Sequence, residues 1–121
     1  MKKKSFLRND DSGKKHLKIV ISDPDAEDMV LVVSVSSIPQ RYRHDDSCEL
    51  FVGDHPWIKH PSFIAYNHCT ELNRTKILSE HFSGEIILKE DISEELLLRI
   101  QEGAKRTKFL AQKYKKYFQF F

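Results

Sequence analysis

The chain has 121 residues, of which 40% are apolar and 31% are charged, and its formal net charge is +2. This length suits one domain with a single core, and the composition is that of a globular protein rather than a disordered or fibrous one. No apolar run approaches the roughly 20 residues that a membrane-spanning helix needs, which excludes a helical membrane protein.

The first residues are basic and polar. The segment that follows the opening MKKKSF is LRNDDSGKK, which lacks the apolar core of a signal peptide, and we therefore expect a cytoplasmic protein. Residues 1–15 offer little to bury, so we predict a flexible basic arm there. In this setting Cys48 and Cys69 are expected to be buried, reduced thiols rather than a disulfide.

The small net charge hides an uneven distribution. Residues 1–18 carry seven Lys or Arg against two Asp, and residues 104–121 carry six Lys or Arg and no acidic residue. Basic ends of this kind are either solvated surface or contacts for a polyanion. The charge pattern leaves both interpretations open.

Short strands separated by turn signals are predicted along most of the chain. Residues 16–23 (HLKIVISD) alternate and are rich in β-branched side chains, and residues 29–38 (MVLVVSVSSI) form a nearly continuous apolar run. These two strands are predicted to pair as a hairpin across an Asp-Pro-Asp turn. Further short strands are predicted in 47–52, 63–69 and 84–90.

A helix is predicted from about residue 93 into the basic tail. Ser93 is placed to cap it, and Leu96, Leu97, Ile100 and Ala104 recur at helical spacing. Several short strands followed by one terminal helix describe a mainly β fold of the α+β class, a small antiparallel barrel or sandwich with a helix against it. We expect residues 16–121 to form this single domain.

Two loops that follow predicted strands carry basic side chains at one end of the sheet, where binding groups are usually mounted. Tyr42 and Trp57 add flat faces on which unpaired bases can stack. Cations and rings together predict a site for single-stranded nucleic acid. The predicted contacts are Arg41, Arg43, His44, His55, Lys59 and His60.

The same residues also allow a structural interpretation. Trp57 is expected mainly as a core anchor at a barrel corner, together with Ile58 and Phe63. For His55 and His60, bracing of the loop is as plausible as contact with a ligand. Mutation of these side chains would separate the two roles.

Five residues that could bind zinc fall within 22 positions, namely Cys48, His55, His60, His68 and Cys69. Their spacing matches no paired zinc motif, and the adjacent His68 and Cys69 would point to opposite faces of a strand. Neither cysteine lies in the setting of a nucleophile. No metal ion and no other cofactor is predicted.

From residue 13 to about 110 the order of elements resembles the PemK/MazF family of toxins from toxin–antitoxin systems. The similar segments are GKKHLKIVIS, VLVVSVSSI, FIAYNHCTELNRTKIL and the helix start DISEELLLRI. GDHPWIKHPSF looks like a His-Pro-aromatic-Ile variant found in divergent PemK-like proteins. The resemblance implies a small SH3-like barrel with a C-terminal helix, metal-independent cleavage of single-stranded RNA, a homodimer and an antitoxin partner.

The resemblance also suggests reacting groups. It implies a hydroxyl near the scissile phosphate, for which we select Ser37 over Ser36. His16 supplies a proton donor or acceptor, because imidazole titrates near neutral pH, and Lys15 or Arg41 supplies positive charge for the transition state.

One departure from the family is clear. Its members usually place an Arg and a Pro just before the first long strand, where this chain has Lys15, His16 and Leu17. Two alternatives therefore stay open. One is a non-catalytic PemK-like barrel that binds nucleic acid or a partner protein, and the other is an unrelated small β-barrel interaction module.

Overall fold

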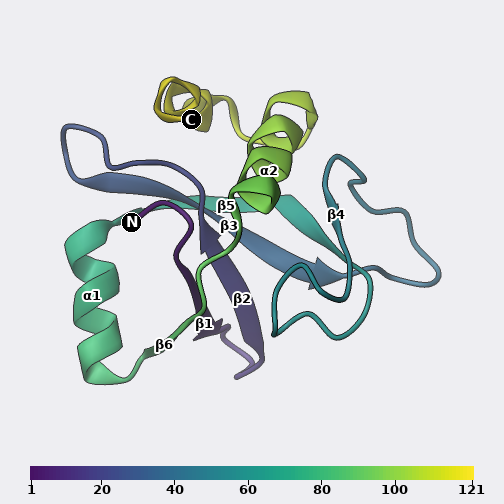
Figure 1. Cartoon of the computed structure of the whole chain (residues 1–121), viewed down its shortest axis with the longest axis horizontal. Helices are drawn as coiled ribbons and strands as arrows, with labels where there is room; N and C mark the ends of the chain where they lie inside the picture. The colour runs from purple at the N-terminus through teal and green to yellow at the C-terminus, as the bar shows by residue number, and fades with distance from the viewer.

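The computed structural model covers residues 1–121 and consists of one six-stranded sheet with three helical segments (Figure 1). All paired strands are antiparallel, in the order β4–β5–β3–β2–β1–β6. The elements are β1 (Ser5–Asn9), β2 (Lys15–Val20), β3 (Met29–Ser37), β4 (Glu49–Leu50), β5 (Ser62–Asn73), α1 (Arg74–Ser83), β6 (Ile86–Lys89), α2 (Glu94–Arg106) and the 3-10 helix η1 (Gln112–Phe120).

The sheet curls without closing into a complete barrel. β4 and β6 are its two edges, and each pairs with one neighbour only. The result is a mainly β fold of the α+β class, an antiparallel half-barrel with helices packed against it. The predicted fold class, a small antiparallel barrel with a C-terminal helix, is confirmed in this open form.

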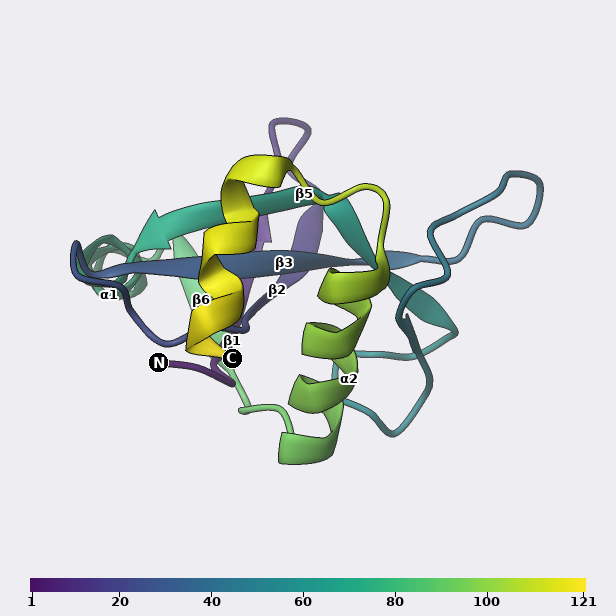
Figure 2. The ribbon, with the colours of Figure 1, turned by 90° about the horizontal axis from the view of Figure 1, so that it is seen from above.

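The larger of two cores lies between one face of the sheet and the C-terminal helices. α2 and η1 lie side by side over this face (Figure 2). The side chain of Ser93 accepts a hydrogen bond from the Leu96 amide (3.1 Å), so it caps α2 as predicted. Leu97, Ile100 and Ala104 are buried on the same side of the helix, which accounts for their helical spacing.

A smaller core lies on the opposite face of the sheet, under α1. The central strands are therefore covered on both faces along part of their length, which is why the first half of β3 is continuously apolar instead of alternating. The buried residues of this core are Phe6, Val20, Val30, Val32, Ile77 and Ile86.

Residues 1–15 do not form a flexible arm, so that prediction is wrong. β1 lies between β2 and β6, and its Phe6 and Leu7 are buried in the smaller and the larger core. In the sequence, Phe6 and Leu7 lie among many charged residues and form no alternating pattern that would predict a strand. Their burial depends on β6, which comes from a distant part of the chain.

The helices also differ from the prediction. α1 occupies a segment for which no helix was predicted, because this helix has no marked apolar stripe and is defined by its ends. The Asn73 side chain accepts a hydrogen bond from the Thr75 amide (2.9 Å), and Gly84 ends the helix with a φ of 83°. The C-terminal helix does not continue through the tail. It stops at Thr107, whose backbone is extended, and helical structure resumes at η1.

Cys48 and Cys69 are buried free thiols, as predicted. Burial raises the pKa of both thiols, for Cys69 to about 12, so neither forms a reactive thiolate near neutral pH. None of the helices combines the length and the apolar character that crossing a membrane requires.

Gly103 lies where α2 packs closely on the sheet. A Cβ atom at this position would overlap the Tyr66 hydroxyl oxygen and lie 2.9 Å from Cys48 Cβ. Tyr66 has little room to move, because its hydroxyl donates a hydrogen bond to the Ile100 carbonyl (2.6 Å). Gly103→Ala is therefore expected to lower the free energy of unfolding by about 1–3 kcal/mol, although Ala is favoured over Gly in a helix by about 1 kcal/mol.

Chemical denaturation measures this difference. Glu102→Ala, at the exposed neighbouring position, is the matched control and should change stability by less than about 0.5 kcal/mol. A Gly103→Ala variant more stable than the parent would show that the helix–sheet contact is looser than described.

Candidate functional site

A cleft opens where β2 and β3 separate. The two strands pair at three positions only, from Lys18 opposite Ser34 to Val20 opposite Val32. Before Lys18, β2 pairs with β1 alone, and after Ser34, β3 pairs with β5 alone. The diverging strand ends leave a cleft of about 450 Å³ between them.

The loop 55–60 forms one wall of this cleft. Ile58 is 4% exposed and belongs to the larger core, and its amide donates to the His55 carbonyl (3.0 Å). Trp57, Lys59 and His60 flank it and line the cleft. Burial of Ile58 thus attaches the loop to the sheet and leaves its neighbours at the surface.

His55 braces this loop from beneath. Its Nδ1 accepts the Trp57 amide (3.0 Å), which places the proton on Nε2, and Nε2 lies 2.9 Å from Ser5 Oγ and 3.1 Å from the Glu90 carbonyl oxygen. The Ser5 hydroxyl donates to the same carbonyl (2.5 Å). His55 is 2% exposed, so it holds the loop and is not available for the predicted contact with nucleic acid.

Ser37 and His60 meet at the mouth of the cleft. Ser37 Oγ lies 2.6 Å from His60 Nε2, and both side chains are exposed. The register of β3 against β5 brings them together, because Ser37 is opposite Ser62, two residues after His60. A hydroxyl and an imidazole in contact can hold or transfer a proton.

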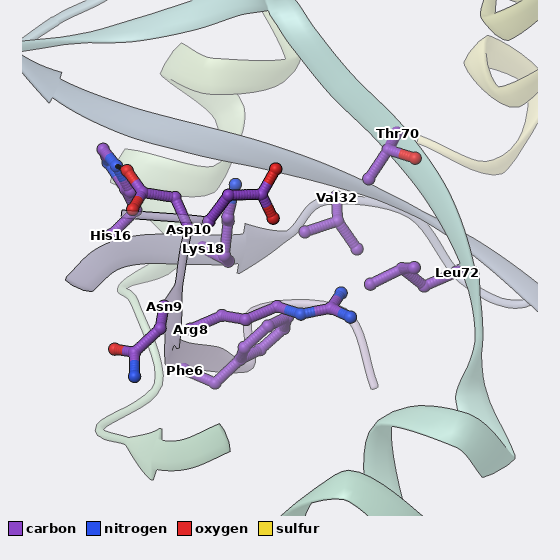
Figure 3. A pocket seen from close by; sticks show the side chains of 10 residues that line it. Phe6, Arg8, Asn9, Asp10, His16, Lys18, Val32, Thr70 and Leu72 are labelled. Carbon is purple, nitrogen blue, oxygen red and sulfur yellow. Dashed lines mark hydrogen bonds and ion pairs between the residues drawn. The ribbon is translucent and has the colours of Figure 1, made fainter. Parts of the chain in front are cut away.

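His16 is oriented by the turn between β1 and β2. Its Nε2 lies 2.9 Å from Asp10 Oδ2 (Figure 3). Asp10 Oδ1 accepts from the Ser12 hydroxyl (2.6 Å) and from the Lys14 amide (3.0 Å). The hydrogen bond from Ser12, followed by that from His16, holds the pKa of Asp10 well below its usual range. Asp10 is therefore an ionised carboxylate that fixes the imidazole of His16.

The lining of the cleft is basic. None of its 12 residues is acidic, whereas Lys14, Lys15 and Lys59 are among them. Ten ion pairs exist in the molecule, and none includes these three lysines. Their charge is available to a polyanion.

The structure brings together five of the nine residues predicted for the site, namely Lys15, His16, Ser37, Lys59 and His60. The other four lie elsewhere. Arg41 and Arg43 are exposed on the loop 38–48, which extends away from the body of the molecule (Figure 2). His44 pairs with Glu49 (2.7 Å), and His55 is buried.

Trp57 is not the core anchor that was expected. It is 40% exposed, whereas Ile58, which was expected in the core beside it, is buried. Phe63 is only partly buried and lies against His44, with ring centroids 5.0 Å apart. The loop therefore presents its indole to solvent beside the cleft.

Three residues of this region were not predicted for the site. Lys14 and Ser36 line the cleft next to the predicted residues Lys15 and Ser37, so adjacency in the sequence was the available signal. Asp10 contacts His16 through a turn whose Asp-Asp-Ser-Gly composition is typical of a tight connection. Recognising β1 would have revealed that turn.

A second cavity, of about 300 Å³, lies on the face of the sheet that also carries α1 (Figure 3). Arg8 and Lys18 line it, and burial, followed by the charge of Arg8, lowers the pKa of Lys18. Asp10, Asp11 and His16 line it as well, so His16 lies between this cavity and the cleft. Mixed charge makes this cavity a poorer match for a polyanion than the cleft between β2 and β3.

No group of three or more His, Cys, Asp or Glu side chains is arranged to hold a metal ion. No protein-family model, curated protein or solved structure matches this chain.

Ile58 and Trp57 are expected to differ in their effect on stability. Ile58→Ala should lower the free energy of unfolding by about 2–5 kcal/mol, because it empties a buried site, whereas Trp57→Ala should lower it by less than about 1 kcal/mol. Thermal and chemical denaturation of both variants checks this. Equal losses of stability in the two variants would show that Trp57 anchors the core as Ile58 does.

Proposed function

We propose that this protein is a cytoplasmic, metal-independent endoribonuclease of the PemK/MazF type that acts on single-stranded RNA in the cleft between β2 and β3. One observation carries the proposal: residues from β2, β3 and the loop 55–60 line one basic cleft that has no acidic residue in its lining. The lining residues include two histidines, three serines and three lysines that take part in no ion pair. Cleavage of RNA through its 2′-hydroxyl needs a proton acceptor, a proton donor and positive charge near the phosphate, and these side chains can supply all three.

Binding rests on the lysines. RNA has one negative charge per nucleotide, and lysines that contact phosphates release counterions. Lys14 and Lys15 come from one wall of the cleft and Lys59 from the other. A strand lying in the cleft therefore meets positive charge on both sides.

The proposed reaction divides two proton transfers between the imidazoles. The 2′-oxygen attacks the adjacent phosphorus while its proton passes to His16, and the Asp10 carboxylate stabilises the imidazolium that forms. The bond from phosphorus to the 5′-oxygen breaks, and His60 gives a proton to that oxygen. The products are a 2′,3′-cyclic phosphate and a 5′-hydroxyl.

Two further groups support this step. Ser37 positions His60 through their hydrogen bond. Lys15 and Lys59 stabilise the negative charge that develops on the phosphate oxygens. The resemblance to PemK/MazF toxins adds an antitoxin partner and a homodimer to the proposal, and an acidic partner segment suits the unpaired lysines of the cleft.

A non-catalytic nucleic-acid-binding protein is the second candidate. One observation favours it: Lys15 and His16 occupy the place of the Arg that the family usually has before its first long strand. The same cleft then binds RNA without cutting it. An assay for cleavage products separates the two candidates.

Binding to single-stranded RNA is expected to weaken steeply with salt. Each phosphate contact adds about 0.7 to the slope of log affinity against log salt for a single strand, so Lys15→Ala and Lys59→Ala should each lower the slope by about that amount. Lys76→Ala, on the exposed surface of α1, is the control. Binding that ignores salt, or equal slopes for all variants, would refute the electrostatic account.

His16 is expected to matter more for the rate of RNA cleavage than for the affinity for RNA. Loss of a general base typically lowers the rate about 10²–10⁴-fold, so His16→Ala should reduce kcat with little change in RNA affinity. His81→Ala, at an exposed position on α1, is the control.

Gel analysis of a labelled RNA measures the rate, and detection of the cyclic phosphate confirms the route. An unchanged rate in His16→Ala would remove this residue from the mechanism. Absence of cleavage by the parent protein, with RNA binding retained, would favour the non-catalytic candidate.

A further inference from the structure

The loop 55–60 separates two clefts rather than bordering one. Trp57, Lys59 and His60 line the cleft between β2 and β3, and the same three residues line a second cleft on the side of β6. This second cleft has a volume of about 500 Å³. We call it the β6 cleft, and its remaining lining residues are His55, Pro56, Lys89 and Glu90.

Trp57 is held rigidly on the ridge between the clefts. Its amide is fixed by His55 Nδ1, the residue before it is a proline, and the residue after it is the buried Ile58. The indole itself is 40% exposed. An aromatic ring on an ordered backbone can bind a base with little loss of conformational freedom.

The β6 cleft also offers an unpaired cation. Lys89 is the last residue of β6 and takes part in none of the ten ion pairs. Glu90, the only acidic residue of the lining, is exposed, and its carbonyl oxygen is already used by Ser5 and His55. Lys59, His60 and Lys89 therefore leave the β6 cleft with a basic balance.

We propose that Trp57 is a base-stacking platform and that the β6 cleft is a second nucleotide subsite, with Lys89 as its phosphate contact. Single-stranded RNA then crosses the loop 55–60, with phosphates in both clefts and a base on the indole between them. This inference rests on the proposed binding of RNA to the cleft between β2 and β3. It adds a binding surface that the reaction itself does not require.

Trp57 makes the test direct, because it is the only Trp in the chain. Its fluorescence is followed during titration with uncleavable 2′-deoxy oligonucleotides of increasing length at low salt. Stacking is expected to quench the emission. Trp57→Ala should weaken binding by roughly tenfold or more, measured with labelled oligonucleotide, whereas Trp57→Phe should retain most of the affinity.

The role of Lys89 is tested by measuring how its substitution changes the affinity for oligonucleotides of different length. Lys89→Ala should weaken long oligonucleotides by roughly threefold to tenfold and leave the shortest ones that bind unchanged. Glu90→Gln should strengthen the binding of long oligonucleotides, because it removes the only negative charge of the β6 cleft while keeping the contacts of the Glu90 backbone carbonyl. Lys76→Ala is the matched control for loss of a surface lysine.

The outcomes separate this inference from the proposed function. RNA binding and cleavage by the parent, with unchanged fluorescence and equal affinities for Lys89→Ala at every length, would overturn the second subsite alone. Absence of RNA binding at low salt would overturn both. Quenching together with a length-dependent loss in Lys89→Ala supports both.

Discussion

The candidate site depends on the hydrogen bonds of one buried imidazole. His55 joins three separate parts of the chain, because its ring contacts Ser5 of β1, the Glu90 carbonyl between β6 and α2, and the Trp57 amide. Only the tautomer with a proton on Nε2 satisfies all three. A buried polar group without partners is costly, and no buried side-chain polar atom of this structure lacks one. The loop 55–60 is therefore kept in one position relative to the sheet.

The strand arrangement uses this fixed loop to build a surface. β3 changes from two partners to one after Ser34, and the space that opens beside β2 is bordered by the loop. Continued pairing of β2 with β3 beyond Ser34 would remove that space. The cleft therefore comes from this local separation of two neighbouring strands inside the sheet, and not from the unpaired edges β4 and β6.

Charge is distributed differently in the cleft and in the rest of the molecule. Elsewhere, some cations such as Lys3 and Arg99 are paired with acidic side chains, and others such as Lys89 are not. Lys14, Lys15 and Lys59 gather without any acidic neighbour in the lining, and like charges placed close together repel. An arrangement that adds no stability to the folded protein is typical of a binding site for an anion.

The sequence by itself determined the main strands and the start of α2. Alternation in residues 16–23 and the cap at Ser93 are local patterns, and they act within a few residues of where they are found. It also identified the basic and histidine-containing segments of the site. It could not identify β1, because Phe6 and Leu7 become buried only when β6 pairs beside them.

Which of the predicted site residues meet was decided by tertiary structure alone. Ser37 contacts His60 through the register of β3 on β5, whereas Arg41, only a few positions along the chain, is carried away on an extended loop. The exposure of Trp57 beside the buried Ile58 has the same origin. Either side chain is apolar enough to anchor the loop, and only the packing of the loop against the sheet determines which of the two is buried and which is exposed.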